Sequence, residues 1–484
     1  MDFIQNLSPY FWTGLNILSM LIRILSLVFV PQHHDSTTAT AWLLVILLWP
    51  IPAIFVYFIL GTNMLPARRL QRHNEALLHF QDVRERIQRH ELPGTTRVHL
   101  PEGLEATAHL AEHLGYMGAV GGNSVQYITS TDEFIAALVH EIDGARHEIN
   151  LLYYIFMDDS MGRRVIDACH RAAGRGVVVR LLVDSVGSRK FLRGDAAKRL
   201  RAAGVCVEEA LPVRIYRAKA ERFDLRNHRK LAIFDRKIAV TGSHNVTEPR
   251  SKRSMMWEDV SLRLCGAVVK QLESVFIEDW YVETGKILDT PHLFTDPVEN
   301  CGSACLQTVP SGPSYQTENY QRLIIASIIS AKKQVTITTP YLIPDVGLLQ
   351  AIEVARLRGV RVRLAIPAQS DHLIVGYASR AYYADFLRYG VDVYLYPGGL
   401  LHAKTVTVDD DLAFVGTSNF DIRSFALNFE INMILYGARE NQGIQRIQNR
   451  YIANSRRLNK KRWQQRGHLS IALESMTKLL SPLL

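Results

Sequence analysis

The chain has 484 residues, of which 48% are hydrophobic and 21% charged, and its net charge is +9. This composition excludes an intrinsically disordered chain, a collagen-like repeat and a small disulfide-built scaffold, and the length suggests about three structural units. The mean hydropathy of zero is high for a soluble enzyme of this charge. We therefore expect apolar and basic residues to be concentrated in particular segments.

Two apolar runs lie near the start of the chain. Residues 11–30 and 41–60 each provide 20 predominantly apolar residues, which is the length of helix that crosses the hydrocarbon core of a bilayer. Pro50 and Pro52 would kink the second helix but are tolerated in membranes. A cleaved signal peptide requires a basic start, and the first ten residues contain no Lys or Arg. The sequence predicts a two-helix transmembrane hairpin.

The charges around this hairpin predict its orientation. The connector between the two runs has no Lys or Arg, whereas Arg68, Arg69 and Arg72 follow the second run directly. Because basic residues are enriched in cytoplasmic loops, both termini and everything after residue 62 are expected in the cytoplasm.

The chain repeats itself from about residue 126. The similar segments are 145–149 with 331–335, 175–181 with 358–364, and 203–209 with 389–395. Strands that alternate with helices predict an α/β fold, here as two duplicated lobes. The expected units are the transmembrane hairpin at 1–65, a juxtamembrane basic helix with its connector at 66–125, lobe 1 at 126–290, a Pro/Gly/Ser-rich linker at 291–315, and lobe 2 with a basic tail at 316–484.

Each lobe contains the same constellation of polar residues at identical spacing. The two sets are His228, Lys230, Asp235 and Asn245, and His402, Lys404, Asp409 and Asn419. Side chains alternate along a strand, so the His and Lys of each set point the same way. An imidazole beside a fixed cation, with an amide nearby, suits an anionic phosphoryl group. One such set arises by chance, but two matched copies indicate a catalytic site.

These motifs resemble the paired HKD signature of the phospholipase D superfamily. The flanking strings FDLRNHRK, GGLLHAKTVTVD and NFDIRSFALNFE, together with the N-terminal spans, resemble bacterial cardiolipin synthases of the membrane-anchored type over essentially the whole chain. The resemblance implies two phospholipase D-type lobes, each a mixed sheet flanked by helices, with the active site between them. It also implies a multi-pass protein of the bacterial inner membrane.

The activity implied by the resemblance is the joining of two phosphatidylglycerol molecules to give cardiolipin and glycerol. It proceeds through a phosphohistidine and needs no metal, nucleotide or redox cofactor. By analogy His228 is the nucleophile and His402 the general acid and base, and the near-symmetry of the lobes leaves the reverse assignment open.

The remaining members of the motifs are expected to support these histidines. Non-bridging phosphate oxygens would be bound by Lys230, Lys404, Asn245 and Asn419. Asp235 and Asp409 stand at strand ends, which favours structural support over chemistry. In the family two later carboxylates hold the second nitrogen of the histidines, and Asp259 and Glu430 fit that role. The alternative for these two is an ordinary carboxylate at a strand edge.

The five cysteines are sparse and odd in number. Cys301 and Cys305 are spaced C-x3-C with no second Cys or His pair nearby, so no zinc site is expected. We expect reduced thiols in a reducing compartment.

The basic residues gather in two windows. Residues 64–90 carry a net charge of +3 and residues 455–466 carry +6. Such clusters are either solvated helix faces or contacts to anionic lipid. After Gly467 an apolar helical stripe contains Leu469, Leu473, Met476 and Leu480, which would lie in the membrane interface or pack on the catalytic lobes. The expected partners are phosphatidylglycerol, other anionic phospholipids and the membrane, and nucleic acid is not expected. The sequence leaves open whether the chain forms a homo-oligomer.

Other functions remain as alternatives. The same site could hydrolyse a phospholipid to phosphatidic acid, or use another donor or acceptor. A nuclease is disfavoured by the membrane hairpin, and a non-catalytic membrane scaffold by the completeness of both motifs.

Overall fold

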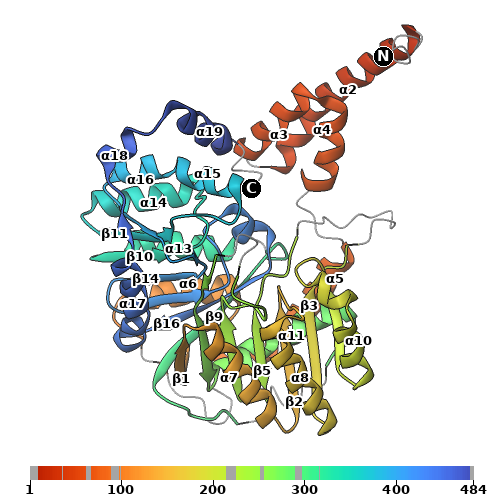
Figure 1. The fold of residues 1–484 in the computed structure, drawn as a ribbon, viewed down its shortest axis with the longest axis vertical. Coiled ribbons are helices and arrows are strands. Elements are labelled where there is room, and N and C mark those ends of the chain that lie inside the picture. The colour runs from red at the N-terminus through yellow and green to blue at the C-terminus, as the bar shows by residue number, and fades with distance from the viewer. Residues whose placement is uncertain are drawn as a thin grey trace.

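The computed structural model of the chain describes residues 9–34, 36–61, 67–88, 98, 100–213, 225–250, 255–288, 297–315 and 317–479 (Figure 1). The helices are α2 (Pro9–His33), α3 (Ser36–Leu48), α4 (Pro50–Val56), the π-helical turn η1 (Tyr57–Gly61), α5 (Ala67–Gln88), α6 (Glu105–Gly115), α7 (Thr131–Gly144), α8 (Ser160–Gly174), α9 (Arg189–Arg193), α10 (Asp195–Ala202), α11 (Val268–Thr284), α13 (Asn319–Ser330), α14 (Val346–Leu357), α15 (Leu373–Ala381), α16 (Tyr383–Tyr389), the π-helical turn η2 (Arg423–Leu427), α17 (Ala438–Ala453), α18 (Lys460–Gln464) and α19 (His468–Leu479). The strands are β1 (Val120–Ile128), β2 (Glu148–Tyr153), β3 (Val178–Asp184), β4 (Cys206–Ala210), β5 (Leu231–Phe234), β6 (Ile238–Gly242), β7 (Trp257–Glu258), β8 (Ser261–Cys265), β9 (Ala304–Ser311), β10 (Gln334–Thr338), β11 (Arg361–Pro367), β12 (Asp392–Tyr396), β13 (Leu400–Leu401), β14 (Thr405–Val408), β15 (Leu412–Gly416), β16 (Glu430–Tyr436) and β17 (Arg456–Arg457).

One mixed sheet runs through both lobes. Within the described residues its fifteen strands have the order β17-β12-β11-β10-β14-β15-β16-β9-β1-β8-β6-β5-β2-β3-β4. Outward from the central β1–β9 pair, the two halves have the same order and the same directions, except that one half has the additional edge strand β17. The strands β2, β3 and β4 are parallel in one half, as are β10, β11 and β12 in the other, while the pairs nearer the centre are antiparallel. The predicted duplicated α/β fold is confirmed.

The crossovers between parallel strands are also alike in the two halves. Helix α8 connects β2 to β3, and α14 connects β10 to β11. Each begins with an aspartate at its N-cap: the Asp159 side chain accepts from the Gly162 N–H, and Asp345 accepts from the Leu348 N–H. These caps satisfy backbone donors that a helix leaves unpaired in its first turn.

The two central strands lie where the sequence suggested other structure. Strand β9 falls within the expected linker at 291–315, and β1 crosses the expected boundary between residues 125 and 126. The composition of both segments argues against a strand, because β1 contains Gly121 and Gly122 and β9 contains Pro310. Every residue of β9 is buried, so its tertiary surroundings override its weak strand propensity. Residues 291–296 of that linker lie outside the described part of the chain.

Each half has its own hydrophobic core, and a third core lies between them. The shared core contains residues from the strands of both halves and from α11. Helix α11 is buried from Val268 to Trp280, although it includes acidic residues such as Glu278 and Asp279. The seam between the lobes is therefore a packed interior rather than a flexible linker.

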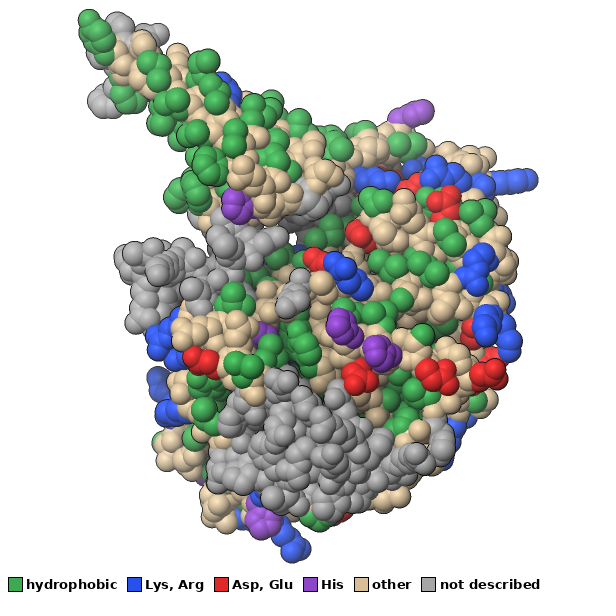
Figure 2. Space-filling view, turned by 180° about the vertical axis from the view of Figure 1, so that it is seen from behind, with side chains coloured by type: hydrophobic (Ala, Val, Ile, Leu, Met, Phe, Trp, Pro, Cys, Tyr) green, Lys and Arg blue, Asp and Glu red, His purple; other side chains and the backbone are tan. Residues whose placement is uncertain are grey.

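The N-terminal helices form an apolar arm that extends from the lobes (Figures 1 and 2). By length and composition, one described helix could cross a membrane, over residues Tyr10–His33. The second apolar run is broken at Trp49: α3 ends before this residue and α4 begins after it, at Pro50. Proline lacks the N–H that would continue the helix, so two uninterrupted spans are not observed. Buried residues including Trp42, Ile46 and Tyr57 pack within this arm.

Part of the first basic window, on α5, contacts protein, while other described side chains of that helix, including Arg68, are exposed. Both Arg69 guanidinium NH groups donate to the Glu283 carboxylate at 2.7 Å. His73 Nδ1 lies 2.6 Å from Glu278 on the same helix, α11. Basic residues of α5 thus dock the segment that follows the apolar arm onto the acidic end of α11.

Candidate active site

The first histidine is placed by contact between the lobes. Asn227 and Phe429 form a parallel bridge, with the His228 N–H donating to the Phe429 carbonyl at 2.9 Å. One residue beyond that bridge, His228 Nδ1 donates to the Glu430 carboxylate at 2.9–3.0 Å. Since Glu430 begins β16 of lobe 2, a lobe 1 histidine is oriented by a lobe 2 carboxylate.

The second histidine has the reciprocal arrangement. Strands β7 and β13 pair in parallel, and the His402 N–H donates to the Glu258 carbonyl at 2.8 Å. The next residue, Asp259, accepts from His402 Nδ1 at 2.6 Å. The two histidine–carboxylate pairs are therefore crossed between the lobes. In each pair Nδ1 is held by the carboxylate, so Nε2 is the nitrogen that could react with a ligand.

The two lysines lie beside their histidines, although residues 228–230 and 402–404 precede β5 and β14 and are not within a strand as the sequence predicted. Lys230 Nζ donates to the His228 carbonyl at 2.7 Å, and Lys404 Nζ donates to the His402 carbonyl at 2.6 Å. Both lysines are only 1% exposed. Burial, aided by the neighbouring Lys404, lowers the pKa of Lys230 to about 7, and burial alone lowers that of Lys404 to about 8. A bound phosphodiester anion would offset this buried positive charge.

The electrostatics of the two histidines differ because their carboxylates differ. Burial, with Lys230 and Lys404 nearby, holds the pKa of His228 well below its ordinary value, so its imidazole is neutral. The Glu430 carboxyl behind it has its pKa raised to about 7 by burial. Burial also acts to raise the pKa of Asp259, but His402 outweighs it and the net shift is downward. Asp259 is thus ionised, which suits a histidine that must hold a proton.

The two asparagines are buried at equivalent positions after β6 and β15. Asn245 Oδ1 accepts from the Ile155 N–H at 3.1 Å, which fixes its amide. Asn419 Oδ1 is buried without a hydrogen-bond partner among the described residues. This oxygen could accept from a hydroxyl of a ligand, whereas a phosphate oxygen would have to be bound by the N–H groups of the same amide.

The aspartates of the motifs are structural in both lobes. Asp235 accepts from the backbone N–H groups of residues 146, 147 and 148 at 2.7–3.0 Å. Asp409 accepts from residues 332, 333 and 334 at 2.7–2.9 Å. Each ties the start of one strand to the hairpin that follows the motif. Both also have φ near +48° (47° and 48°), a conformation that aspartate tolerates better than most residues.

Three further residues at the site were not predicted. The Tyr154 ring centroid lies 4.9 Å from that of His228, and the Trp257 ring stacks on His402 at 5.1 Å. Arg229, between the first His and Lys, is 1% exposed and donates to Asp279 at 2.6 Å and to the Glu430 carbonyl at 3.1 Å. The sequence could have singled out Arg229, because the two motifs differ at this position and the second has an alanine there.

The expectation of reduced thiols is wrong for two cysteines. Cys265, at the end of β8, and Cys301 form a disulfide with their Cα atoms 5.8 Å apart. Sequence reasoning considered Cys301 with Cys305, whereas pairing in the sheet brings Cys301 to a residue 36 positions away. The described free cysteines are Cys169, Cys206 and Cys305.

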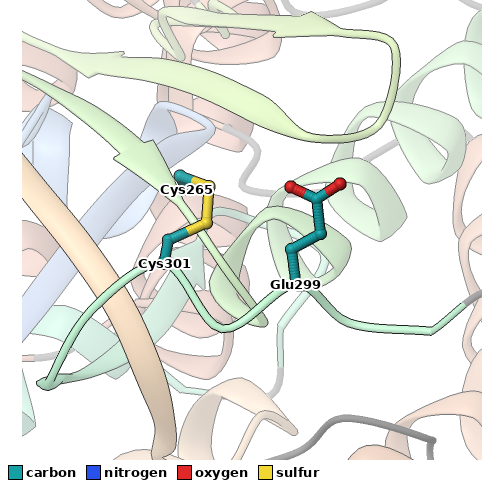
Figure 3. A group of neighbouring side chains, drawn as sticks. All are labelled: Cys265, Glu299 and Cys301. Carbon is teal, nitrogen blue, oxygen red and sulfur yellow. A yellow bond between two sulfur atoms is a disulfide. The ribbon is translucent and has the colours of Figure 1, made fainter.

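Glu299 lies beside this disulfide, and the three side chains place possible ligand atoms within 4.8 Å of one another (Figure 3). Sulfurs joined in a disulfide are not the thiolates that bind zinc or iron. The Glu299 carboxylate instead accepts from Lys237 Nζ at 2.8 Å. The disulfide and the ion pair thus join the segment that precedes β9 to the end of β8 and the start of β6.

A duplicated mixed sheet that brings one histidine–lysine pair from each half into a buried site defines a phospholipase D-type protein. A family model described as "Cardiolipin synthase, PLD-like domain" matches residues 138–280 and 324–452. The chain belongs to this family of phospholipase D-like cardiolipin synthases.

Curated relatives extend the similarity to nearly the whole chain. Cardiolipin synthase A of Pectobacterium atrosepticum is 36% identical over 474 residues, and that of Cronobacter sakazakii is 35% identical, with 96% of each chain covered in both cases. The solved structure of phosphatidylserine synthase from Haemophilus influenzae Rd KW20 superposes with a TM-score of 0.57 at 15% identity. It covers 74% of this chain and 95% of its own, and shows a shared fold.

The aspartate contacts generate a prediction about stability. Asp409→Ala removes three charge-assisted hydrogen bonds and places alanine at positive φ, so we expect a loss of about 2–4 kcal/mol. Unfolding by urea of the detergent-solubilised chain measures it. The matched control is Asp410→Ala, whose exposed carboxylate pairs with Lys333 and should contribute under about 1 kcal/mol. A fully stable but inactive Asp409→Ala protein would contradict the structural role.

Proposed function

We propose that the protein is a membrane phosphatidyltransferase that joins two phosphatidylglycerol molecules to give cardiolipin and glycerol. The observation that carries this proposal is the pair of buried histidines, each oriented by a carboxylate of the other lobe. Two histidines allow one to bond to phosphorus while the other moves the proton. The full-length similarity to curated cardiolipin synthases supports the choice of lipid.

In the first half-reaction His228 Nε2 attacks the phosphorus of one phosphatidylglycerol. The bond from phosphorus to the glycerol oxygen breaks as the His402 imidazolium protonates that oxygen, so glycerol leaves and a phosphatidyl–histidine remains. The neutral state of His228 favours it as the nucleophile. Burial lowers the pKa of His402 as well, but Asp259 acts to raise it, and this stabilisation of the imidazolium favours His402 as the acid.

In the second half-reaction the now neutral His402 takes the proton from a glycerol hydroxyl of a second phosphatidylglycerol. The hydroxyl oxygen attacks phosphorus and the phosphorus–nitrogen bond breaks, which gives cardiolipin and restores both histidines. In both steps Lys230, Lys404 and the asparagine amides stabilise charge on the non-bridging oxygens. One phosphodiester replaces another, so the exchange is balanced without another reactant.

Transfer instead of hydrolysis requires that water reach the phosphohistidine less readily than a lipid hydroxyl does. His228 is 8% exposed and His402 is 7% exposed, so both already lie in a water-poor site. A position at the membrane surface concentrates lipid hydroxyls there. Phosphatidic acid formation is the competing outcome that an assay must separate.

The product assay tests the proposal directly. Purified full-length protein in phosphatidylglycerol vesicles should form cardiolipin and free glycerol in equal amounts without nucleotide, as measured by lipid mass spectrometry and a glycerol assay. His228→Ala and His402→Ala should each reduce turnover by at least about 10³-fold. The control is His170→Ala, at an exposed position on α8. Phosphatidic acid as the sole product would exclude a synthase, and a requirement for a CDP-activated lipid would exclude the mechanism.

We further propose a multi-pass anchor in the bacterial inner membrane with the lobes on the cytoplasmic side. The three arginines that follow the apolar arm support this orientation, namely Arg68, Arg69 and Arg72. The Cys265–Cys301 disulfide is the feature that favours an oxidising compartment, and in the cytoplasm this pair would be kept as thiols.

Cys206 is a natural reporter of the orientation, because it is exposed on β4 of lobe 1. A membrane-impermeant maleimide should leave it unlabelled in intact spheroplasts and label it once the membrane is opened, as read by intact-protein mass spectrometry. Cys206→Ser provides the background. Labelling of Cys206 in sealed spheroplasts would place the lobes outside the cytoplasm.

A further inference from the structure

Helix α19 is amphipathic, but it presents its polar side to the protein. Glu474 is the one residue of α19 that is buried among those described, at 1% exposed. Its carboxylate accepts from Arg380 on α15 at 3.1 Å and from Arg466 at 2.9 Å. Lys478 Nζ adds an ion pair of 2.8 Å to Asp385 on α16. Charged contacts therefore fix the helix and its rotation.

The described part of the apolar stripe of α19 faces away from the lobe as a result, and Leu480 of the predicted stripe lies outside the described residues. Leu469 is 76% exposed, Met476 65% and Leu479 72%. Helix α15, which packs beside α19, adds Leu373 and Ile374, at 59% and 54% exposed. We call these five residues together with Leu473 the α15–α19 face. A helix at the surface of a water-soluble domain would have the opposite rotation, so an apolar surface of this kind indicates a partner.

Basic side chains precede the α19 part of the face in the chain. Lys460, Lys461 and Arg462 of α18 are exposed just before α19, within the window of residues 455–466 that has no acidic residue. An apolar helix face with a basic flank matches the boundary between headgroups and acyl chains of an anionic leaflet. A protein partner of equal fit would need its own acidic border around an apolar groove.

The position of α19 in the molecule agrees with this occupant. In Figure 1 it lies toward the same end of the long axis as the apolar arm of α2, α3 and α4. A bilayer that holds α2 is therefore within reach of α19. Among the described residues no segment covers the face, since its apolar side chains keep the exposures given above.

We propose that the α15–α19 face is a second membrane contact, which inserts into the surface of an anionic leaflet while α18 contacts its phosphate groups. The lobes are then held at two places, by the N-terminal arm and by this face, with the active site in a fixed orientation to the lipid. The proposal goes beyond phosphatidyl transfer and does not depend on it, because lipid insertion is measured without turnover.

The test is a depth measurement on the reconstituted full-length chain. In a Cys206→Ser background, Met476→Cys carries an environment-sensitive nitrobenzoxadiazole label, and the protein is placed in phosphatidylglycerol-containing liposomes with brominated acyl chains. The matched control is His170→Cys on α8, which is exposed but far along the chain from the face. We expect blue-shifted emission at position 476 and quenching several-fold greater than at position 170.

A change of lipid and a substitution within the face complete the test. Quenching at position 476 should fall when phosphatidylglycerol is replaced by phosphatidylcholine, and when Leu469→Glu is added. Quenching no greater than at position 170 would overturn the proposal. Blue-shifted emission without quenching, which weakens as protein is diluted in lipid, would instead show a contact between two copies of the chain and would also overturn it. Equal quenching in both lipids would overturn the role of the basic flank.

Discussion

Two hydrogen bonds that cross between the lobes determine the active site. Glu430 of lobe 2 holds His228, and Asp259 of lobe 1 holds His402. Neither lobe contains a complete histidine–carboxylate pair, so a competent site exists only when both halves of the sheet are joined. The central β1–β9 pair, the buried helix α11 and the short β7–β13 pair are best understood as the means of fixing that junction.

The same arrangement compensates in part for the free energy that is lost when the charged side chains of the site are buried. Two lysines and two histidines share one interior, and burial lowers all four pKa values; nearby cations lower those of His228, Lys230 and His402 further. Buried cations persist only when paired, and Asp259 and Glu430 supply part of the compensation. A phosphodiester anion supplies more, so the site is most favourable electrostatically when it is occupied by substrate. The asymmetry between an ionised Asp259 and a Glu430 with raised pKa distinguishes two otherwise equivalent halves.

Much of this could be predicted from local sequence, because local periodicity and spacing encode it. The duplicated α/β fold follows from repeated segments, whereas the expected strand at each His-x-Lys segment begins only after the lysine. The crossed pairing could not be predicted, since its partners are 202 and 143 residues apart and only the folded sheet brings them together. The same reason explains the missed Cys265–Cys301 disulfide and the strand β9 within the expected linker. The stripe on α19 was visible in the sequence, whereas its outward rotation is decided by Glu474, Arg380 and Arg466.

The crossed pairing is tested most directly with an activated substrate, the p-nitrophenyl ester of phosphatidic acid, whose phenolate leaves without a proton. In stopped flow, Asp259→Asn should retain a burst of one nitrophenolate per enzyme and then turn over slowly, because it impairs His402 and spares His228. Glu430→Gln should lose the burst, because it impairs the nucleophile across the lobe boundary. A burst retained by Glu430→Gln and lost in Asp259→Asn would contradict the account.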